Sequence, residues 1–197
     1  MLNGNKIVPV IVINNLEDTI PMLKGLADGG INVAEITFRT ECAKEAIEIG
    51  RKEFPDMLIG AGTILNASQA HEAVKAGAMF IVSPGFDKET CDYLRGKGIT
   101  YIPGAVTPTE VMNVIKNGIE VIKFFPASNY GGIKTLKALN GPFKGVKFLP
   151  TGGIDESNIL EYLALDNVEA VGGSFMMKGD IKENTKRVLT LINSKGE

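Results

Sequence analysis

The stretch IEVIKFFPA, residues 119–127, is a short run of β-branched and aromatic residues that predicts a buried strand and contains one lysine, Lys123. Seven similar runs recur about every 20 to 26 residues, which is the size of one strand–helix unit. Runs that are apolar almost throughout indicate burial on both faces, as in a parallel sheet covered by helices. The other seven runs are IVPVIVI (7–13), VAEITF (33–38), MLIGAG (57–62), MFIVS (79–83), ITYIP (99–103), VKFLP (146–150) and VEAVGG (168–173).

Segments with helical spacing and helix-start signals separate the apolar runs. Thr107 and Glu110 have the spacing of a capping box, with Pro108 at the first helical position. Asp155 is expected to open a seventh helix, ESNILEYLAL. Eight strand–helix units predict an α/β fold, a single-domain (β/α)8 TIM barrel over residues 1–197. About 250 residues are typical of this fold, so a barrel of 197 residues must be compact, with short loops. The other start signals are Asn15 or Asp18 before IPMLKGLA, Thr40 before ECAKEAIEIG, and Asn66 before ASQAHEAVKAG.

Composition and charge limit the classes of function. The 197 residues are 44% hydrophobic, with 21 basic and 23 acidic side chains and no long run of like charge. This balance argues against a nucleic-acid surface, and no apolar run approaches the roughly 18 residues of a membrane span. The first residues lack a signal-peptide pattern, and Cys42 and Cys91 suit neither a metal site nor a disulfide framework. We therefore expect a cytoplasmic protein whose partners are small molecules or copies of itself.

Lys123 is unusual because apolar residues flank its amine. Its neighbours are Ile122, Phe124 and Phe125, and desolvation disfavours the charged form of a lysine. Its pKa is therefore expected to fall from about 10.4 toward roughly 7 to 8. A neutral amine can form a Schiff base with a carbonyl substrate. The alternative that this segment leaves open is a strand-end lysine whose amine reaches solvent.

In a (β/α)8 barrel, residues at the carboxyl ends of different strands meet on one face. Glu35 lies among apolar neighbours, so its carboxylate must be paired with a cation, protonated or used in catalysis. Two interpretations remain open: a salt bridge to Arg39 or Lys123, and a role as general acid/base. Arg39 is either a clamp for a substrate carboxylate or an ordinary exposed arginine. The same strand-end rule selects Thr63, Ser83-Pro84-Gly85, Pro103-Gly104, Phe125, Thr151-Gly152-Gly153 and Gly172-Gly173-Ser174.

Two glycine pairs lie at the ends of the last two runs. PTGGI (150–154) precedes the helix expected near Asp155, and GGS (172–174) overlaps the end of the eighth run. Glycines let an anion approach the backbone, and a helix N-terminus offers free N–H groups, although glycines also serve merely to form tight turns. A phosphate-binding site here, together with Lys123, Glu35 and Arg39, indicates a site for a phosphorylated 2-keto acid. No metal is implied. The predicted phosphate ligands are Gly152, Gly153, Gly173 and Ser174.

Nine stretches, in order along nearly the whole chain, carry a resemblance to a known family. The sequence resembles 2-keto-3-deoxy-6-phosphogluconate (KDPG) aldolase, which often also acts as 4-hydroxy-2-oxoglutarate (KHG) aldolase. The resemblance implies a class I, Schiff-base lyase on a (β/α)8 barrel, homotrimeric and without metal or cofactor. The stretches are VPVIVI, AEITFRTECA, IGAGTILN, FIVSPGF, IPGAVTPTE, KFFPA, LNGPF, FLPTGGI and VGGSF.

The resemblance also implies roles for single residues. Lys123 of KFFP would form the Schiff base, and Glu35 of AEITFRTE would move protons. Arg39 of FRTE and Thr63 of GAGT would hold the pyruvate-like carboxylate. Thr151 of PTGG would favour the gluconate-derived substrate, because relatives acting on the galactonate epimer tend to carry an aliphatic residue there. The remaining candidates for the substrate pocket are Pro84 and Phe125.

The expected reaction is cleavage of KDPG to pyruvate and glyceraldehyde 3-phosphate through an imine on Lys123. One alternative is an aldolase that prefers KHG or the galactonate epimer. Another is a phosphosugar isomerase or a phosphate-binding barrel, since the fold alone does not determine function. Lys123 and Glu35 discriminate between these classes, because an isomerase needs an acid/base pair but no imine, and a binding module needs neither.

Overall fold

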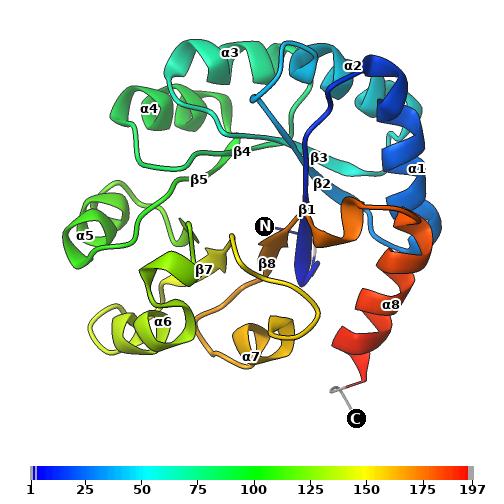
Figure 1. Ribbon diagram of the computed structural model, residues 1–197. Helices are drawn as coiled ribbons and strands as arrows, with labels where there is room; N and C mark the ends of the chain where they lie inside the picture. The colour runs from blue at the N-terminus through cyan, green and yellow to red at the C-terminus, as the bar shows by residue number, and fades with distance from the viewer. Residues whose placement is uncertain (1, 3, 195–197) are drawn as a thin grey trace.

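In the described part of the chain, eight short strands alternate with helices, and the helices surround the strands (Figure 1). The computed structural model describes residue 2 and residues 4–194. Each predicted apolar run contains one strand, so the predicted order of strands is confirmed. The strands are β1 (Ile7–Ile11), β2 (Val33–Thr37), β3 (Leu58–Gly62), β4 (Phe80–Val82), β5 (Thr100–Ile102), β6 (Val121–Phe124), β7 (Lys147–Pro150) and β8 (Val171–Gly173).

All the strand pairings are parallel. Six strands form one curled sheet in the order β5-β4-β3-β2-β1-β8, and β6 pairs with β7. Single parallel bridges join Gly104 to Lys123 and Thr151 to Gly172, so β6 and β7 continue the direction of the larger sheet. The predicted α/β class with a parallel sheet is therefore confirmed. Because the strands run the same way, their carboxyl ends share one edge, where the candidate residues lie.

Asp18, Asn66 and Thr107 each directly precede a helix as predicted, whereas the predicted start at Thr40 is wrong because α2 follows Cys42. Asn66 caps α3, where its Oδ1 accepts the Gln69 N–H at 2.9 Å. Thr107 and Glu110 form the capping box of α5, and Pro108 is the first residue of that helix. No helix within residues 4–194 is long and apolar enough to cross a membrane. The helices are α1 (Thr19–Gly29), α2 (Ala43–Glu53), α3 (Ala67–Lys75), α4 (Lys88–Lys97), α5 (Pro108–Lys116), α6 (Gly132–Asn140), α7 (Ile159–Leu163) and α8 (Ile181–Asn193), with 3₁₀ turns η1 (Leu16–Asp18), η2 (Ser128–Tyr130) and η3 (Phe175–Met177).

The prediction that Asp155 opens the seventh helix is wrong, because α7 begins at Ile159. The Asp155 carboxylate accepts the Ser157 N–H at 2.9 Å, and the Asn158 side chain accepts the Asp155 N–H at 3.1 Å. Such local side-chain bonds compete with helical hydrogen bonds and hold a turn instead. The glycine pair after β7 therefore precedes a turn and not a helix N-terminus.

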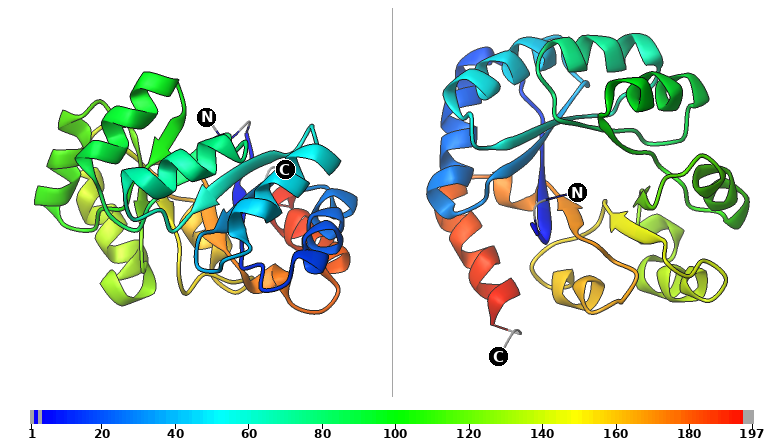
Figure 2. Two further views of the ribbon diagram at one scale, coloured as in Figure 1. Left: turned by 90° about the horizontal axis from the view of Figure 1, so that it is seen from above. Right: turned by 180° about the vertical axis from the view of Figure 1, so that it is seen from behind.

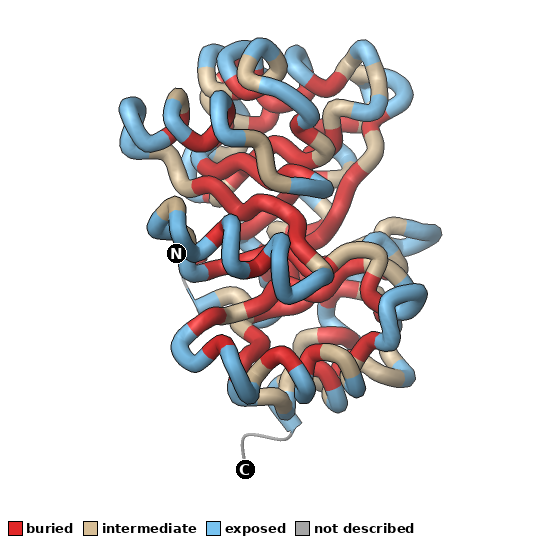
Figure 3. The backbone as a smooth tube through the Cα atoms, turned by 90° about the vertical axis from the view of Figure 1, so that its left-hand side faces the viewer, coloured by how far each residue is buried: buried red, intermediate tan, exposed pale blue. Residues whose placement is uncertain are grey.

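One hydrophobic core draws residues from all eight strands. Figure 3 shows the buried chain in the middle of the molecule, with exposed segments along the outer helices. The rings of Phe124 and Phe148 pack edge to face with centroids 6.2 Å apart. Phe80 covers Gly60, where a Cβ would lie only 2.4 Å from the ring. Close packing of this kind gives the strand ends a rigid base.

The first and last helices lie side by side, as two further views show (Figure 2). Gly25 and Gly29 of α1 face α8, and a Cβ on Gly29 would lie 2.4 Å from the Cβ of Thr185. This close approach connects the two ends of the fold. It depends on the absence of a side chain at Gly29.

Replacing Gly29 with alanine will therefore destabilise the fold. Overpacking against Thr185 is expected to lower the free energy of unfolding by about 1–3 kcal/mol. The matched control is Gly96→Ala in α4, where a Cβ would meet nothing within 4 Å. The higher helix propensity of alanine should raise stability there by up to about 1 kcal/mol. Urea unfolding measures the free energy of unfolding of both variants. Changes of the same sign in the two variants would contradict the packing argument.

Candidate active site

Lys123 of β6 and Glu35 of β2, 88 residues apart in sequence, form a buried ion pair. The distance from Nζ to Oε1 is 3.1 Å, and the two side chains are 3% and 0% exposed. The amine does not reach solvent, so the interpretation of Lys123 as a solvent-reaching lysine is wrong. The partner of Glu35 is Lys123 and not Arg39, which is exposed. Mutual compensation explains how both charges are buried.

The ion pair retains unused hydrogen-bonding capacity. Oε2 of Glu35 is buried and has no hydrogen-bond partner among the described residues. Buried polar atoms without partners are rare, and at a strand end they point to a position for water or a substrate group. On another side, the ring centroid of Phe125 lies 5.4 Å from Nζ of Lys123. The Lys123 amine thus lies beside the Phe125 ring. The low dielectric of this buried site strengthens the electrostatic interaction between the amine and the Glu35 carboxylate.

Thr63 and Arg39 lie together at the ends of β3 and β2. Nε of Arg39 donates a hydrogen bond of 3.0 Å to Oγ1 of Thr63. In the part of the chain that the structure describes, Thr63 is the only non-glycine residue with positive φ, at 58°. A β-branched residue is rarely found in this conformation, and such strain clusters at functional sites. The backbone conformation of Thr63 places its hydroxyl toward Arg39, and the hydrogen bond between them orients the Arg39 guanidinium group.

Replacing Thr63 with glycine will stabilise the fold and weaken substrate binding. Glycine adopts this φ freely and relieves about 1–3 kcal/mol of strain, of which about 0.5–1 kcal/mol is lost again to unfolded-state entropy. Without Oγ1, Arg39 loses its orienting acceptor, and because Arg39 is the predicted clamp for a substrate carboxylate, we expect KM to rise several-fold. Thr63→Ala is the control, because it removes the hydroxyl but keeps the unfavourable φ. Urea unfolding and steady-state kinetics separate the two effects, and equal stabilities of the two variants would refute the strain argument.

The predicted phosphate ligands lie at the ends of β7 and β8, which the Thr151–Gly172 bridge holds together. Gly152 and Gly153 have left-handed backbones, with φ of 95° and 76°. A Cβ on Gly153 would lie 2.3 Å from Oγ of Ser128, so the turn packs against the loop after β6. Thr151 and Gly173 are buried, whereas Gly153 and Ser174 are exposed.

Ser128 is not among the residues predicted from the sequence, although it lies in this cluster. Its N–H donates to the Gly152 carbonyl at 3.1 Å, and its hydroxyl covers Gly153. It follows β6 by only four residues, and the strand-end rule extended through that loop would select it.

Pro84 and Phe125 line one cavity of about 520 Å³ at the carboxyl ends of β4, β5 and β6, and neither Lys123 nor Glu35 lines it. Glu110 lies on its wall, but its carboxylate accepts the N–H groups of Val106 and Thr107 at 2.9 and 2.8 Å. These two hydrogen bonds hold the pKa of Glu110 below its ordinary value. This carboxylate therefore serves to cap α5, and Glu35 is the carboxylate that contacts the amine.

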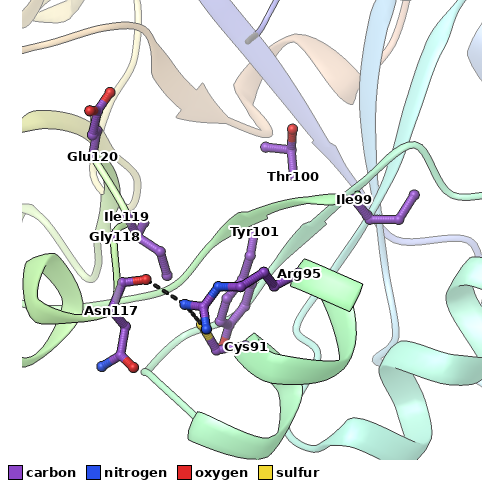
Figure 4. Close-up of a pocket in the computed structure, with 9 residues that line it drawn as sticks. All are labelled: Cys91, Arg95, Ile99, Thr100, Tyr101, Asn117, Gly118, Ile119 and Glu120. Carbon is purple, nitrogen blue, oxygen red and sulfur yellow. Dashed lines mark hydrogen bonds between the residues drawn. The ribbon is translucent and has the colours of Figure 1, made fainter. Parts of the chain in front are cut away.

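A second cavity, of about 220 Å³, lies near the amino ends of β5 and β6, away from these strand ends (Figure 4). Arg95 donates to the Asn117 carbonyl and to Sγ of Cys91. Burial raises the pKa of the Cys91 thiol, so this sulfur is not a reactive thiolate. Arg95, the cation of this cavity, is therefore engaged in structural hydrogen bonds. The pair of Lys123 and Glu35 remains the candidate catalytic site.

These features define the class of protein. No group of three or more His, Cys, Asp or Glu side chains that would hold a metal ion occurs within residues 4–194. A buried amine beside a buried carboxylate at the carboxyl edge of a parallel α/β sheet is the arrangement expected of an enzyme whose lysine attacks a carbonyl group.

The chain belongs to the KDPG and KHG aldolase family, whose model matches residues 1–191. The 2-dehydro-3-deoxy-phosphogluconate aldolase of Dickeya dadantii (strain 3937) is 45% identical over 184 residues, which are 93% of this chain and 86% of the relative. The KDPG aldolase of Legionella pneumophila, solved with pyruvate captured as a covalent carbinolamine, is 42% identical with a TM-score of 0.89, covering 98% and 95% of the two chains. The KDPG aldolase of Zymomonas mobilis ZM4, solved with 3-phosphoglycerate, is 37% identical with a TM-score of 0.90, covering 95% and 92%. The family resemblance of the sequence motifs is confirmed.

Proposed function

We propose that this enzyme is a class I lyase that cleaves KDPG to pyruvate and glyceraldehyde 3-phosphate through a Schiff base on Lys123. The observation that carries the proposal is the buried pair of Lys123, next to last in β6, and Glu35, in the middle of β2, with Nζ and Oε1 3.1 Å apart. Family membership and the names of the relatives, at 37–45% identity, support the same substrate.

Imine formation uses the amine of Lys123. The Lys123 ammonium loses one proton to solvent, and its neutral nitrogen attacks the C2 ketone and forms a carbinolamine. The carbinolamine hydroxyl takes up a proton from solvent and leaves as water, which gives an iminium ion, and Glu35 remains a carboxylate for the next step. The captured carbinolamine of the Legionella relative supports this first step.

Carbon–carbon cleavage uses the carboxylate of Glu35. Directly or through a water, Glu35 takes the proton of the C4 hydroxyl, and the C3–C4 bond breaks as its electron pair moves to the iminium. Glyceraldehyde 3-phosphate leaves and an enamine remains. Proton return to C3 and hydrolysis of the imine release pyruvate and restore the lysine.

The remaining residues bind the two ends of the substrate. Arg39, oriented by Thr63, clamps the C1 carboxylate with its remaining guanidinium N–H groups. Thr151 is assigned the discrimination at C4 that favours the gluconate-derived epimer. Pro84 and Phe125 form the pocket wall. The phosphate ligands are Gly152, Gly153, Gly173 and Ser174, for which the two left-handed turn glycines and the phosphorylated ligand of the Zymomonas relative give support.

We extend the proposal to the whole chain. Residues 1–197 form a single aldolase domain, a closed (β/α)8 barrel, although residues 1, 3 and 195–197 lie outside the described part. The bridges from Gly104 to Lys123 and from Thr151 to Gly172 support closure. The barrel assembles as a homotrimer in the cytoplasm, where its two free cysteines suit a reducing environment.

Intact-mass analysis after borohydride reduction with pyruvate tests the proposed chemistry. One reduced pyruvate adduct per chain is expected, located on Lys123 by peptide mapping, with none when pyruvate is omitted. A folded protein that gives no adduct would contradict the lyase and favour the isomerase or binding barrel. Comparing kcat/KM for KDPG, its galactonate epimer and unphosphorylated KHG then ranks the substrates, and a preference for KHG would overturn the phosphate assignment.

A further inference from the structure

We propose that Gly62, the last residue of β3, is a positioning residue for the Glu35 carboxylate. A Cβ at position 62 would lie 2.0 Å from Oε1 of Glu35 and 2.6 Å from both Cδ and Cγ. Oε1 is also the atom that accepts the hydrogen bond from Nζ of Lys123. The backbone of Gly62 therefore forms the surface against which the reacting carboxylate rests. This inference rests on the proposed lyase function.

The backbone conformation at Gly62 does not itself require glycine. Its φ lies outside the left-handed region, and the residue pairs in regular parallel register with Thr37 of β2. An alanine at this position meets no backbone strain, so its effect must come from contact with Glu35. Thr63, the next residue, carries the unusual φ instead.

Glu35 has little freedom to avoid a larger residue at position 62. The side chain is 0% exposed, so the atoms packed around it limit where the carboxylate can move. An ordinary contact between heavy atoms is about 3.5 Å, and a contact of 2.0 Å would therefore force Oε1 to move by more than about 1 Å. A displacement of about 1 Å at a catalytic group can reduce rate about 10²-fold. The missing side chain of Gly62 thus sets the geometry of proton transfer.

The test separates imine formation from proton transfer. In D₂O, the Schiff base of pyruvate loses a methyl proton to Glu35, and return of a deuteron from solvent labels the methyl group. Gly62→Ala should retain the borohydride-trapped adduct on Lys123, while methyl exchange and kcat for KDPG fall about 10²-fold and KM changes less. Exchange within about three-fold of the parent rate would overturn the proposal.

Gly60→Ala is the matched control on the same strand. The three atoms nearest to its Cβ would all belong to the ring of Phe80, at 2.4–2.5 Å, whereas at Gly62 they all belong to Glu35. It should lower the denaturation midpoint while methyl exchange per folded molecule stays within about three-fold of the parent. An equal loss of exchange in both variants would indicate a general packing effect and overturn the assignment.

A double-mutant cycle with Glu35→Ala tests the contact independently of catalysis. Once Glu35 is truncated, the overlap disappears, so Gly62→Ala should no longer shift the denaturation midpoint or further reduce exchange. If Gly62→Ala alone fails to fold, the double variant should regain the stability of Glu35→Ala, and failure to recover would overturn the proposal. The stability cycle can be measured even if the parent protein forms no imine, so failure of the proposed function and failure of the Gly62 assignment give different results.

Discussion

Replacing Lys123 with methionine will abolish the reduced pyruvate adduct and lower turnover of KDPG by about 10⁵-fold or more. Methionine keeps an unbranched side chain of similar length but has no amine, so the covalent route is lost and only substrate binding remains. Mass analysis after borohydride reduction and steady-state kinetics measure the two losses. Full cleavage by this variant would show that the assignment of Lys123 is wrong.

The same substitution changes stability for a separate reason. Loss of one partner leaves the buried Glu35 carboxylate uncompensated, which typically costs about 3–5 kcal/mol. The double variant Lys123→Met/Glu35→Leu should recover most of that free energy and stay inactive, because apolar groups of similar volume replace the pair. Lys147→Met in the adjacent strand β7 is the control, since Lys147 lies at the amino end of its strand and bonds the Asp166 carbonyl. It should leave both activity and adduct formation unchanged.

The strands could be predicted from sequence because burial on both faces leaves a continuous apolar pattern. Local hydrogen bonds are harder to predict, as Asp155 demonstrates. Its type and position suit a helix N-cap, but bonds with Ser157 and Asn158 hold a turn and delay the helix to Ile159. The choice between cap and turn depends on side-chain geometry and not on residue type.

The candidate site could be predicted in part. Lys123 and Glu35 were identifiable separately, because each places a charge within an apolar run. The sequence left Arg39 and Lys123 open as partners of Glu35, and the structure selects Lys123, 88 residues away. Two further features leave no recognisable pattern in the sequence: the strained φ of Thr63 and the close approach of Gly62 to Glu35. Threonine and glycine are common near the end of a strand, so neither residue stands out. The sequence therefore identifies the chemical groups, and the structure identifies which groups meet.

Replacing Glu35 with glutamine will slow turnover by about 10²–10⁴-fold while Lys123 still forms the reduced pyruvate adduct. The amide keeps the shape of the side chain, and its oxygen can still accept the hydrogen bond from Nζ of Lys123. It cannot accept the proton of the C4 hydroxyl as a carboxylate does. Single-turnover kinetics with KDPG should therefore contain a near-normal binding phase and a slow cleavage phase.

A surface carboxylate provides the control for this substitution. Glu156 pairs with Arg187 at 2.7 Å on the exposed surface, where an ion pair typically contributes about 0–1 kcal/mol. Glu156→Gln should leave cleavage unchanged. If Glu35→Gln instead lost the adduct as completely as Lys123→Met, Glu35 would be needed to supply the free amine and its separate role in cleavage would be contradicted. Retention of the adduct with slow cleavage would assign nucleophilic attack to Lys123 and proton transfer at C4 to Glu35, since only the second step then depends on the carboxylate.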